Sequence, residues 1–202
     1  MLIFLLILII SYLFGNIPSS VLVGKYFGID IRTKGSKNPG ATNTLRTLGL
    51  KAGLIAFLGD FFKGTVAVLV SIFIAKTLNG DIYMAKYISA LAVVCGHNWP
   101  FTLNFKGGKG VATTYGALMA ISPLVTVTSM IFFIVVVAVT KYVSLGSMLG
   151  VTLFVILMAI RGDYGGVWVC TLLTLSVLYK HRQNIKRLIN GNESRFSLKK
   201  NK

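Results

Sequence analysis

Three polar segments of this chain combine glycines, cations and hydrogen-bonding side chains in patterns suited to binding anions. The first segment reads GSKNPGATNTLR, residues 35–46. Its Gly, Pro, Asn, Ser and Thr residues favour turns with exposed backbone amides, and such amides bind anions together with hydroxyls and an arginine. A solvated loop that only connects two helices is the alternative. The candidate phosphate-binding residues are Ser36, Gly40, Thr42, Asn43 and Arg46.

The second segment reads GHNWP, residues 96–100, followed by FKGGKGVAT, residues 105–113. Glycines let the backbone approach a phosphate, the two lysines supply charge, and a helix beginning near Val111 would direct its positive dipole end at the anion. The spacing GxxxxGK[ST] of nucleotide-hydrolysing loops is absent. His97 is a candidate proton acceptor or orienting group. The candidate phosphate ligands are Lys106, Gly107, Gly108, Lys109 and Gly110.

The third segment, HRQNIKRLINGNE at residues 181–193, follows an apolar run. On a helix continuing from that run, His181 and Asn184 share one face, while Arg182 and Lys186 share another. A basic helix beside a membrane would be ordinary, but adjacent His and Asn side chains favour a functional role. Ser144, near the start of an earlier apolar run, could hydrogen-bond a substrate or serve a close helix contact, and both readings stay open.

The elements that must position these segments are long apolar helices. Hydrophobic residues make up 54% of the 202 positions, and a hydrocarbon layer about 30 Å thick needs roughly 20 apolar residues per helix. Ser122 and Pro123 divide one 30-residue run, because proline interrupts a helix. The sequence therefore predicts an all-α integral membrane protein with seven transmembrane helices, at Leu2–Val23, Leu54–Leu78, Tyr83–Phe101, Val111–Ile121, Leu124–Thr140, Val143–Ile160 and Tyr164–Tyr179.

The charged residues orient these seven spans. The chain has 21 Lys and Arg but only 5 Asp and Glu. With the N-terminus outside and the C-terminus cytoplasmic, all cations except Lys63, Lys76, Lys86 and Arg161 lie on the cytoplasmic side, in agreement with the positive-inside rule. We therefore expect an integral membrane protein whose re-entrant or interfacial cytoplasmic loops form the site. Asp60 and Lys63, three apart inside the second span, can neutralise each other.

The remaining expectations concern domains and partners. We expect one domain over residues 1–202, with residues 194–202 as a flexible basic tail. No pattern indicates a metal site, a cofactor, an obligate protein partner or nucleic-acid binding. The cation excess suits membrane lipids and phosphate-bearing metabolites as partners.

Taken together, the three segments resemble the signature segments of the bacterial acyl-phosphate:glycerol-3-phosphate acyltransferase family, PlsY, and the resemblance covers essentially the whole chain. It implies an enzyme of the bacterial inner membrane that moves a fatty acyl group from acyl phosphate to the 1-hydroxyl of sn-glycerol 3-phosphate, giving lysophosphatidate and phosphate. It also places five catalytic residues in the glycerol-phosphate pocket: Ser36, Arg46, Lys109, His181 and Asn184.

Such a reaction needs orientation and charge stabilisation more than a covalent intermediate, because acyl phosphate is already activated. The sequence has neither a GxSxG motif nor an HxxxxD pair. The proton can go to His181, to His97 or to the departing donor phosphate, and we favour the donor phosphate. A transporter of phosphorylated metabolites is the alternative function. It predicts a polar path through the bilayer, whereas only Asp60 and Lys63 are clearly ionisable at depth.

Overall fold

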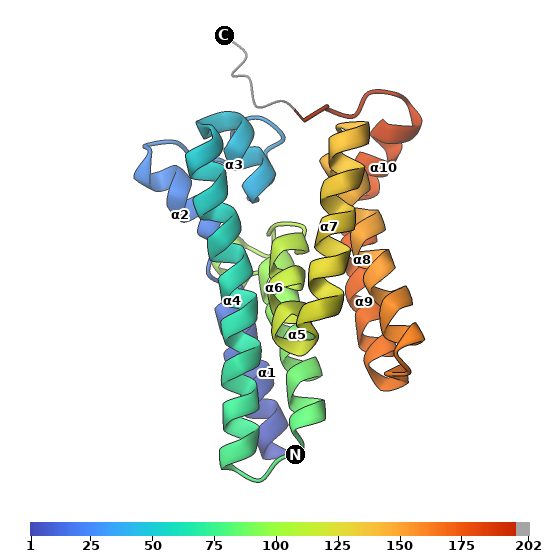
Figure 1. Ribbon diagram of the computed structural model, residues 1–202. Coiled ribbons are helices and arrows are strands. Elements are labelled where there is room, and N and C mark those ends of the chain that lie inside the picture. The colour runs from blue at the N-terminus through green and yellow to red at the C-terminus, as the bar shows by residue number, and fades with distance from the viewer. Residues whose placement is uncertain (197–202) are drawn as a thin grey trace. The chain divides into compact units, whose positions relative to one another are not determined.

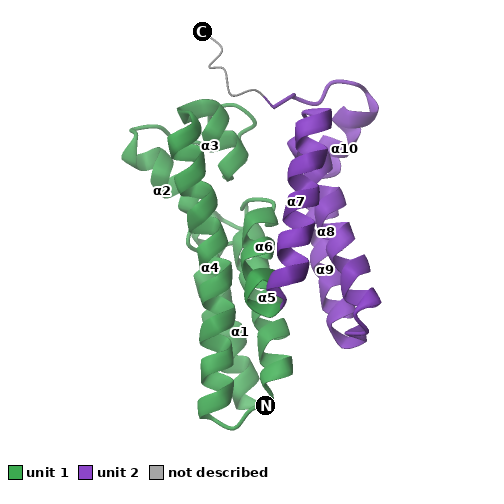
Figure 2. Cartoon of the chain, in the orientation of Figure 1, with its two compact units in different colours: residues 1–121, 200–202 green, residues 122–199 purple. Residues whose placement is uncertain are grey.

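The computed structural model describes residues 1–196, and within that range it contains helices and loops but no strand (Figure 1). Internal contacts divide the chain into two compact units. Unit 1 comprises residues 1–121, and unit 2 begins at Ser122 (Figure 2). The single-domain expectation stays a prediction. The part of the expected tail at residues 197–202 lies outside the described residues.

Unit 1 is organised around its longest helix, α4. This helix packs against α1, α2, α3, α5 and α6, and α1 also packs along α5. The Asp81 side chain caps the start of α5 by accepting hydrogen bonds from the backbone amides of Tyr83 and Met84. The elements of unit 1 are α1 (Leu2–Gly15), α2 (Ser19–Tyr26), α3 (Ala41–Leu48), α4 (Leu50–Thr77), α5 (Ile82–Asn98), the 3₁₀-helix Phe101–Leu103 and α6 (Val111–Ile121).

The first predicted span is two helices rather than one. The apolar run continues across the break, but Pro18 has no N–H, and the chain leaves the helical conformation before α2 begins. The amide of Val21 bonds to the carbonyl of Pro18 rather than to that of Ile17. The Ile17 carbonyl instead accepts a hydrogen bond from Lys63 Nζ of α4 at 2.7 Å. The prediction of a continuous helix over Leu2–Val23 is therefore wrong at this point.

Glycines allow close helix contacts inside unit 1. A Cβ atom on Gly64 of α4 would overlap a backbone carbonyl of α6, and one on Gly116 of α6 would overlap a backbone carbonyl of α4. Gly15 of α1 and Gly96 of α5 face each other's helices in the same way. Small residues at such contacts are typical of membrane helices. The Gly15–Gly96 contact brings the end of α1 against the end of α5, where the second polar segment starts.

Unit 2 is a stack of three long helices that ends in a short one. Within it α7 packs on α8, α8 packs on α9, and α10 follows α9. Pro123 occupies the first turn of α7, where its missing N–H costs nothing, and Asp163 caps α9 through the amide of Gly166 at 3.0 Å. Beyond α10, the amide of Phe196 donates to the Lys141 carbonyl at 2.6 Å. The helices are α7 (Pro123–Thr140), α8 (Val143–Ile160), α9 (Tyr164–Lys180) and α10 (Arg182–Ile189).

A helix occurs in each of the seven predicted ranges, and among residues 1–196 four helical segments are long and apolar enough to cross a membrane. These are Leu2–Tyr26, Leu50–Thr77, Pro123–Thr140 and Val143–Ile160. Large apolar side chains project outward from them, as at Phe73, Ile134 and Ile160. The 11-residue α6 extends only about 16 Å, roughly half a hydrocarbon layer. The count of seven spans and the orientation of the termini stay predictions.

Candidate functional site

The first polar segment is half loop and half helix. We expected turns throughout, but α3 begins directly after Gly40, whose backbone is extended. The Thr44 hydroxyl donates to the Gly40 carbonyl at 3.2 Å. Within α3, Thr42 and Arg46 are four residues apart and share a face. Arg46 and Ser36 are exposed and Thr42 is half-buried, so all three are accessible to a ligand.

Asn43 lies on the buried side of α3 and shapes the preceding loop. Its side-chain amide donates both hydrogens within the chain, to the carbonyls of Ile31 at 3.0 Å and Lys34 at 3.1 Å. Its Oδ1 accepts the backbone N–H of Ser36 at 2.8 Å. A phosphate needs donors, and this conformation has none to offer at Asn43. The structure therefore assigns Asn43 to positioning Ser36, whereas we had expected it to bind phosphate directly.

The glycines of the second segment are required by the packing of the chain on itself. The amides of Gly107 and Gly108 donate to the carbonyls of Asn98 and His97, at 3.2 and 3.1 Å, which attaches the loop to the end of α5. A Cβ atom on Gly107 would overlap the His97 carbonyl, and one on Gly108 would overlap His97 Nε2. The predicted helix start near Val111 is confirmed.

A basic cavity joins the first and second segments inside unit 1. Its volume is about 270 Å³, near the lower limit for small-molecule pockets, so it suits a small anion. Arg32 was not a candidate from the sequence because it precedes the first segment. Its guanidinium contacts the Asp30 carboxylate at 2.9 Å, which lowers the Asp30 pKa chiefly through the side-chain hydrogen bond. The lining residues are Arg32, Lys37, Pro39, Leu103, Asn104 and Lys106.

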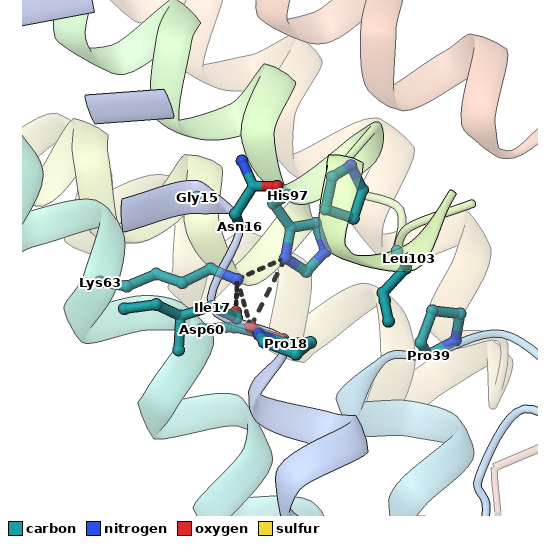
Figure 3. A pocket seen from close by; sticks show the side chains of 11 residues that line it. Gly15, Asn16, Ile17, Pro18, Pro39, Asp60, Lys63, His97 and Leu103 are labelled. Atoms are coloured by element: carbon teal, nitrogen blue, oxygen red, sulfur yellow. Dashed lines mark hydrogen bonds and ion pairs between the residues drawn. The ribbon is translucent and has the colours of Figure 1, made fainter. Parts of the chain in front are cut away.

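A second polar group of unit 1 consists of Asp60, Lys63 and His97 (Figure 3). It is buried beside residues 107–110, which we call the glycine loop. Lys63 Nζ lies 2.8 Å from Asp60 Oδ1, which confirms the expected pairing within α4. It also lies 2.9 Å from Nδ1 of His97, the last-turn histidine of α5, and Asp60 Oδ1 is 3.5 Å from that same nitrogen. His97 therefore has a carboxylate neighbour that sequence spacing could not reveal.

The third segment begins at a break between two helices. Residues 164–180 form α9, His181 is a turn residue, and α10 starts at Arg182, so the continuous helix we expected is interrupted. His181 and Asn184 are nevertheless both buried, with exposed fractions of 3% and 7%. His181 Nδ1 lies 2.8 Å from the Val177 carbonyl. Because a carbonyl only accepts, Nδ1 carries the hydrogen, and in the neutral ring Nε2 is the acceptor.

Glu193 is the centre of the polar network in unit 2, and sequence reasoning missed its role. Its Oε1 accepts hydrogen bonds from Ser144 Oγ and Asn184 Nδ2, both at 2.7 Å, and its Oε2 accepts one from Arg187 Nε at 2.7 Å. The hydroxyl hydrogen of Ser144 is thus committed to Glu193. The sequence left open whether Ser144 hydrogen-bonds a substrate phosphate or serves a close helix contact. The structure instead gives it the task of holding the carboxylate that orients Asn184.

The Glu193 carboxylate is kept ionised by these donors. Burial raises the pKa of Glu193, but the hydrogen bonds from Asn184, Ser144 and Arg187 lower it by more, so the pKa lies below its ordinary value. The negative charge on Glu193 in turn strengthens the hydrogen bonds from Ser144, Asn184 and Arg187.

All five acidic side chains of the protein have partners within their own unit. Asp81 and Asp163 cap helices, Asp30 and Asp60 pair with Arg32 and Lys63, and Glu193 binds the third segment. Among residues 1–196, no group of three or more His, Cys, Asp or Glu side chains is placed to hold a metal ion.

The structure thus groups the predicted residues within each unit. Unit 1 contains the first two segments, with the basic cavity between them and Ser36, Arg46 and Lys109 in their loops and helices. Unit 2 brings Ser144, which is distant in sequence, to the third segment.

Comparisons with known proteins cover most of the chain. Residues 5–191 match the family model described as glycerol-3-phosphate acyltransferase. Over 198 residues, 98% of this chain and 97% of the relative, the sequence is 50% identical to the glycerol-3-phosphate acyltransferase of Clostridioides difficile (strain 630). Over 189 residues, 93% and 95% of the two chains, it is 45% identical to the protein of the same name from Bacillus subtilis (strain 168).

The comparison with solved structures indicates the same family. The fold matches a crystal structure of PlsY, described as an integral membrane glycerol 3-phosphate acyltransferase, in its glycerol 3-phosphate form, with a TM-score of 0.88, 35% identity and 96% of each chain covered. The lysophosphatidic acid form of that protein matches with a TM-score of 0.87, 34% identity and the same coverage. This chain therefore belongs to the glycerol-3-phosphate acyltransferase family.

Proposed function

We propose that this protein is a membrane acyltransferase that moves a fatty acyl group from acyl phosphate to the 1-hydroxyl of sn-glycerol 3-phosphate. The family supports the acceptor and the reaction type. The observation that carries the proposal for this chain is the basic cavity of about 270 Å³ between its first two polar segments. Both substrates are anions, and bringing two anions together requires a concentrated positive field.

The chemistry is a direct transfer. The glycerol oxygen attacks the acyl carbonyl carbon, a C–O bond to the acceptor forms, and the C–O bond to the donor phosphate breaks. The proton of the attacking hydroxyl goes to the departing phosphate, so lysophosphatidate and inorganic phosphate are the products. The acidic side chains support this assignment, because all five have partners and none of them lines the basic cavity.

Each polar segment has a role in this scheme. Arg46 grips substrate phosphate oxygens through its planar fork, and Lys109 adds a point charge. Ser36, whose backbone N–H is held by Asn43, donates a hydrogen bond from its hydroxyl to glycerol 3-phosphate. Nε2 of His181 accepts a hydrogen bond from a glycerol hydroxyl, while Asn184 is held in place by Glu193. No cofactor enters the scheme.

The membrane setting follows the charge distribution. We infer seven spans, an outer N-terminus and cytoplasmic polar segments in the bacterial inner membrane, which agrees with the positive-inside rule. Single cysteines at the exposed positions Ser36, Lys106 and Gln183, in a chain whose own cysteines are replaced, test this orientation. All three should react with an impermeant thiol reagent only when it is applied to the cytoplasmic face. Reaction from the outer face at any of them contradicts the arrangement.

The transporter alternative gains no support. It requires polar groups along a path through the bilayer, whereas the ionisable pair inside α4 is buried and internally paired.

A direct assay tests the proposed function. Purified protein receives labelled glycerol 3-phosphate with acyl phosphate in one reaction and with acyl-CoA in another. Lysophosphatidate should form with acyl phosphate alone. Product from acyl-CoA would overturn the choice of donor, and product from neither donor would overturn the enzyme assignment.

A further inference from the structure

The cluster of Asp60, Lys63 and His97 has no part in the chemistry proposed above, although it holds two buried charges. The exposed fractions of the three residues are 2%, 6% and 8%. Burying an ion pair costs desolvation that its attraction often fails to recover, and apolar residues of similar size can replace such pairs without loss of stability. The cluster therefore calls for an explanation beyond helix packing.

The cavity beside this cluster is smaller than either proposed substrate. The cavity that adjoins it has a volume of about 10 Å³, which is about the space of one water molecule. Neither glycerol 3-phosphate nor the head of an acyl phosphate fits there. The three side chains can therefore influence the reaction only through the residues they contact.

Lys63 connects three separate parts of unit 1 (Figure 3). Its ammonium group donates to the Ile17 carbonyl at 2.7 Å, where the chain breaks between α1 and α2. It contacts Asp60 on its own helix at 2.8 Å and His97 Nδ1 at the end of α5 at 2.9 Å. Because an ammonium group only donates, Nδ1 accepts and the hydrogen of the neutral imidazole lies on Nε2. The contact thus fixes both the tautomer and the orientation of the His97 ring.

The opposite edge of that ring supports the glycine loop. A Cβ atom added to Gly108 would overlap His97 Nε2, so ring and loop backbone are in direct contact. The Gly108 amide also bonds to the His97 carbonyl at 3.1 Å. A rotated imidazole would displace the Gly108 backbone, and with it Lys106 and Lys109 on either side.

We propose that Lys63 is a positioning residue: by holding His97 in one orientation, it fixes the backbone of residues 107–110 and thereby the positions of Lys106 and Lys109, which bind the phosphate of glycerol 3-phosphate. This inference rests on the proposed role of that loop. The competing explanation is that Asp60 and Lys63 only neutralise each other inside α4.

Three variants separate the two explanations. Lys63→Met removes the hydrogen bonds but leaves Asp60 unpaired, so it can fail to fold. Asp60→Asn/Lys63→Met removes both charges. His97→Gln keeps the ion pair and removes only the ring. Thr65→Val is the matched control, because the Thr65 hydroxyl makes a different interhelical bond from α4, to the Gly116 carbonyl at 2.8 Å.

The readout is steady-state kinetics on protein that is monodisperse in detergent. The double variant and His97→Gln should each raise KM for glycerol 3-phosphate about tenfold while kcat changes less than threefold, and Thr65→Val should keep both constants. A double variant with the KM of the unmodified protein shows simple neutralisation and overturns the proposal. If the double variant does not fold, His97→Gln decides alone, and an unchanged KM there overturns the proposal as well.

A separate arm tests the loop itself. Lys109→Met should raise the same KM. If it does not, the loop does not bind this substrate, and the proposed function of the loop fails irrespective of Lys63. If Lys109→Met raises KM while the cluster variants leave it unchanged, only the role of Lys63 is refuted.

Discussion

The two units organise their polar groups in opposite ways. In unit 1 the buried cluster draws Asp60 and Lys63 from the middle of α4 and a histidine from the end of α5, and its charges are paired at depth. In unit 2 a single carboxylate, Glu193, lies after the last helix and collects three donors. The Asp60–Lys63 pair can lose both charges together without leaving an unpaired buried charge. Replacing Glu193, in contrast, removes the shared acceptor of three donors at once. We therefore expect unit 2 to be more sensitive to one substitution.

The largest effect is expected at Glu193. Glu193→Gln preserves the shape of the side chain but removes the negative charge of the group that accepts hydrogen bonds from Asn184 and Ser144. Hydrogen bonds to charged groups contribute about 1.5–3 kcal/mol each, and we leave the partly exposed Arg187 contact out of the sum. The lower end of this range for the two bonds, about 3 kcal/mol together, corresponds to a fall in catalytic efficiency of at least about 100-fold. Asp163→Asn is the control, since asparagine also caps a helix. Similar losses for both variants would mean that Glu193 has no special role.

The same carboxylate predicts a pH dependence of stability. Because the folded pKa of Glu193 is below its ordinary value of 4.5, its ionised form stabilises the fold above that value. The contribution is lost as the pH falls through the lower, folded pKa. Thermal unfolding midpoints of the unmodified protein and Glu193→Gln should differ most near neutral pH and converge in strong acid. A difference that stays constant over this range would contradict the assignment.

The next effect tests unit 1. Arg46→Lys keeps the charge but removes the planar fork, and part of a charge-assisted interaction worth about 1.5–3 kcal/mol is lost. Catalytic efficiency should fall about tenfold or more. Arg195→Lys, an exposed arginine outside the three segments, is the control. Arg32 does not qualify, because it lines the basic cavity. Equal, small effects at Arg46 and Arg195 would remove Arg46 from the site.

A smaller effect distinguishes two serines of α8. Ser144 donates to Glu193, whereas the Ser147 hydroxyl donates to the Val143 carbonyl of its own helix at 2.8 Å. Ser144→Ala should lower kcat/KM about fivefold, which is less than the full contribution of a hydrogen bond to a charged group, because Asn184 and Arg187 still hold the carboxylate. Ser147→Ala should have almost no effect. If the two variants behave alike, the link from α8 to Glu193 is not used.

The sequence predicted the helices better than it predicted the groups that join them. Long apolar runs located a helix in all seven ranges, because burial in lipid demands length and composition alone. Two departures are local. The apolar run hid the break at Pro18, and the polar composition hid α3, whose Arg46 and Thr42 become neighbours only once the helix exists. A third departure is the interruption at His181 of the helix expected to continue from the last span.

The joining groups depend on contacts that no local spacing encodes. Lys63 and His97 are 34 residues apart, and Ser144 and Glu193 are 49 apart. Sequence reasoning identified Gly107 and Gly108 as residues that need to be glycine, but it assumed that the space was for phosphate. In the structure the backbone and ring of His97 occupy that space. The sequence identified which residues to consider as site candidates. The partner of each candidate could be identified only from the three-dimensional structure.

The smallest predicted effect concerns Arg32, which tests whether the basic cavity acts as a site or only as part of a positive surface. Arg32 is exposed and already contacts Asp30 at 2.9 Å, so an added interaction with substrate is screened by solvent and should contribute no more than about 1 kcal/mol. Arg32→Gln should raise KM for the phosphate substrates about two- to threefold at low ionic strength, and this difference should vanish in high salt. Lys76→Gln, in the last turn of α4, removes the same charge from the same unit at a position that does not line the cavity. It should leave KM unchanged. Equal shifts for both variants would attribute the effect to net charge and would leave the cavity without a role of its own.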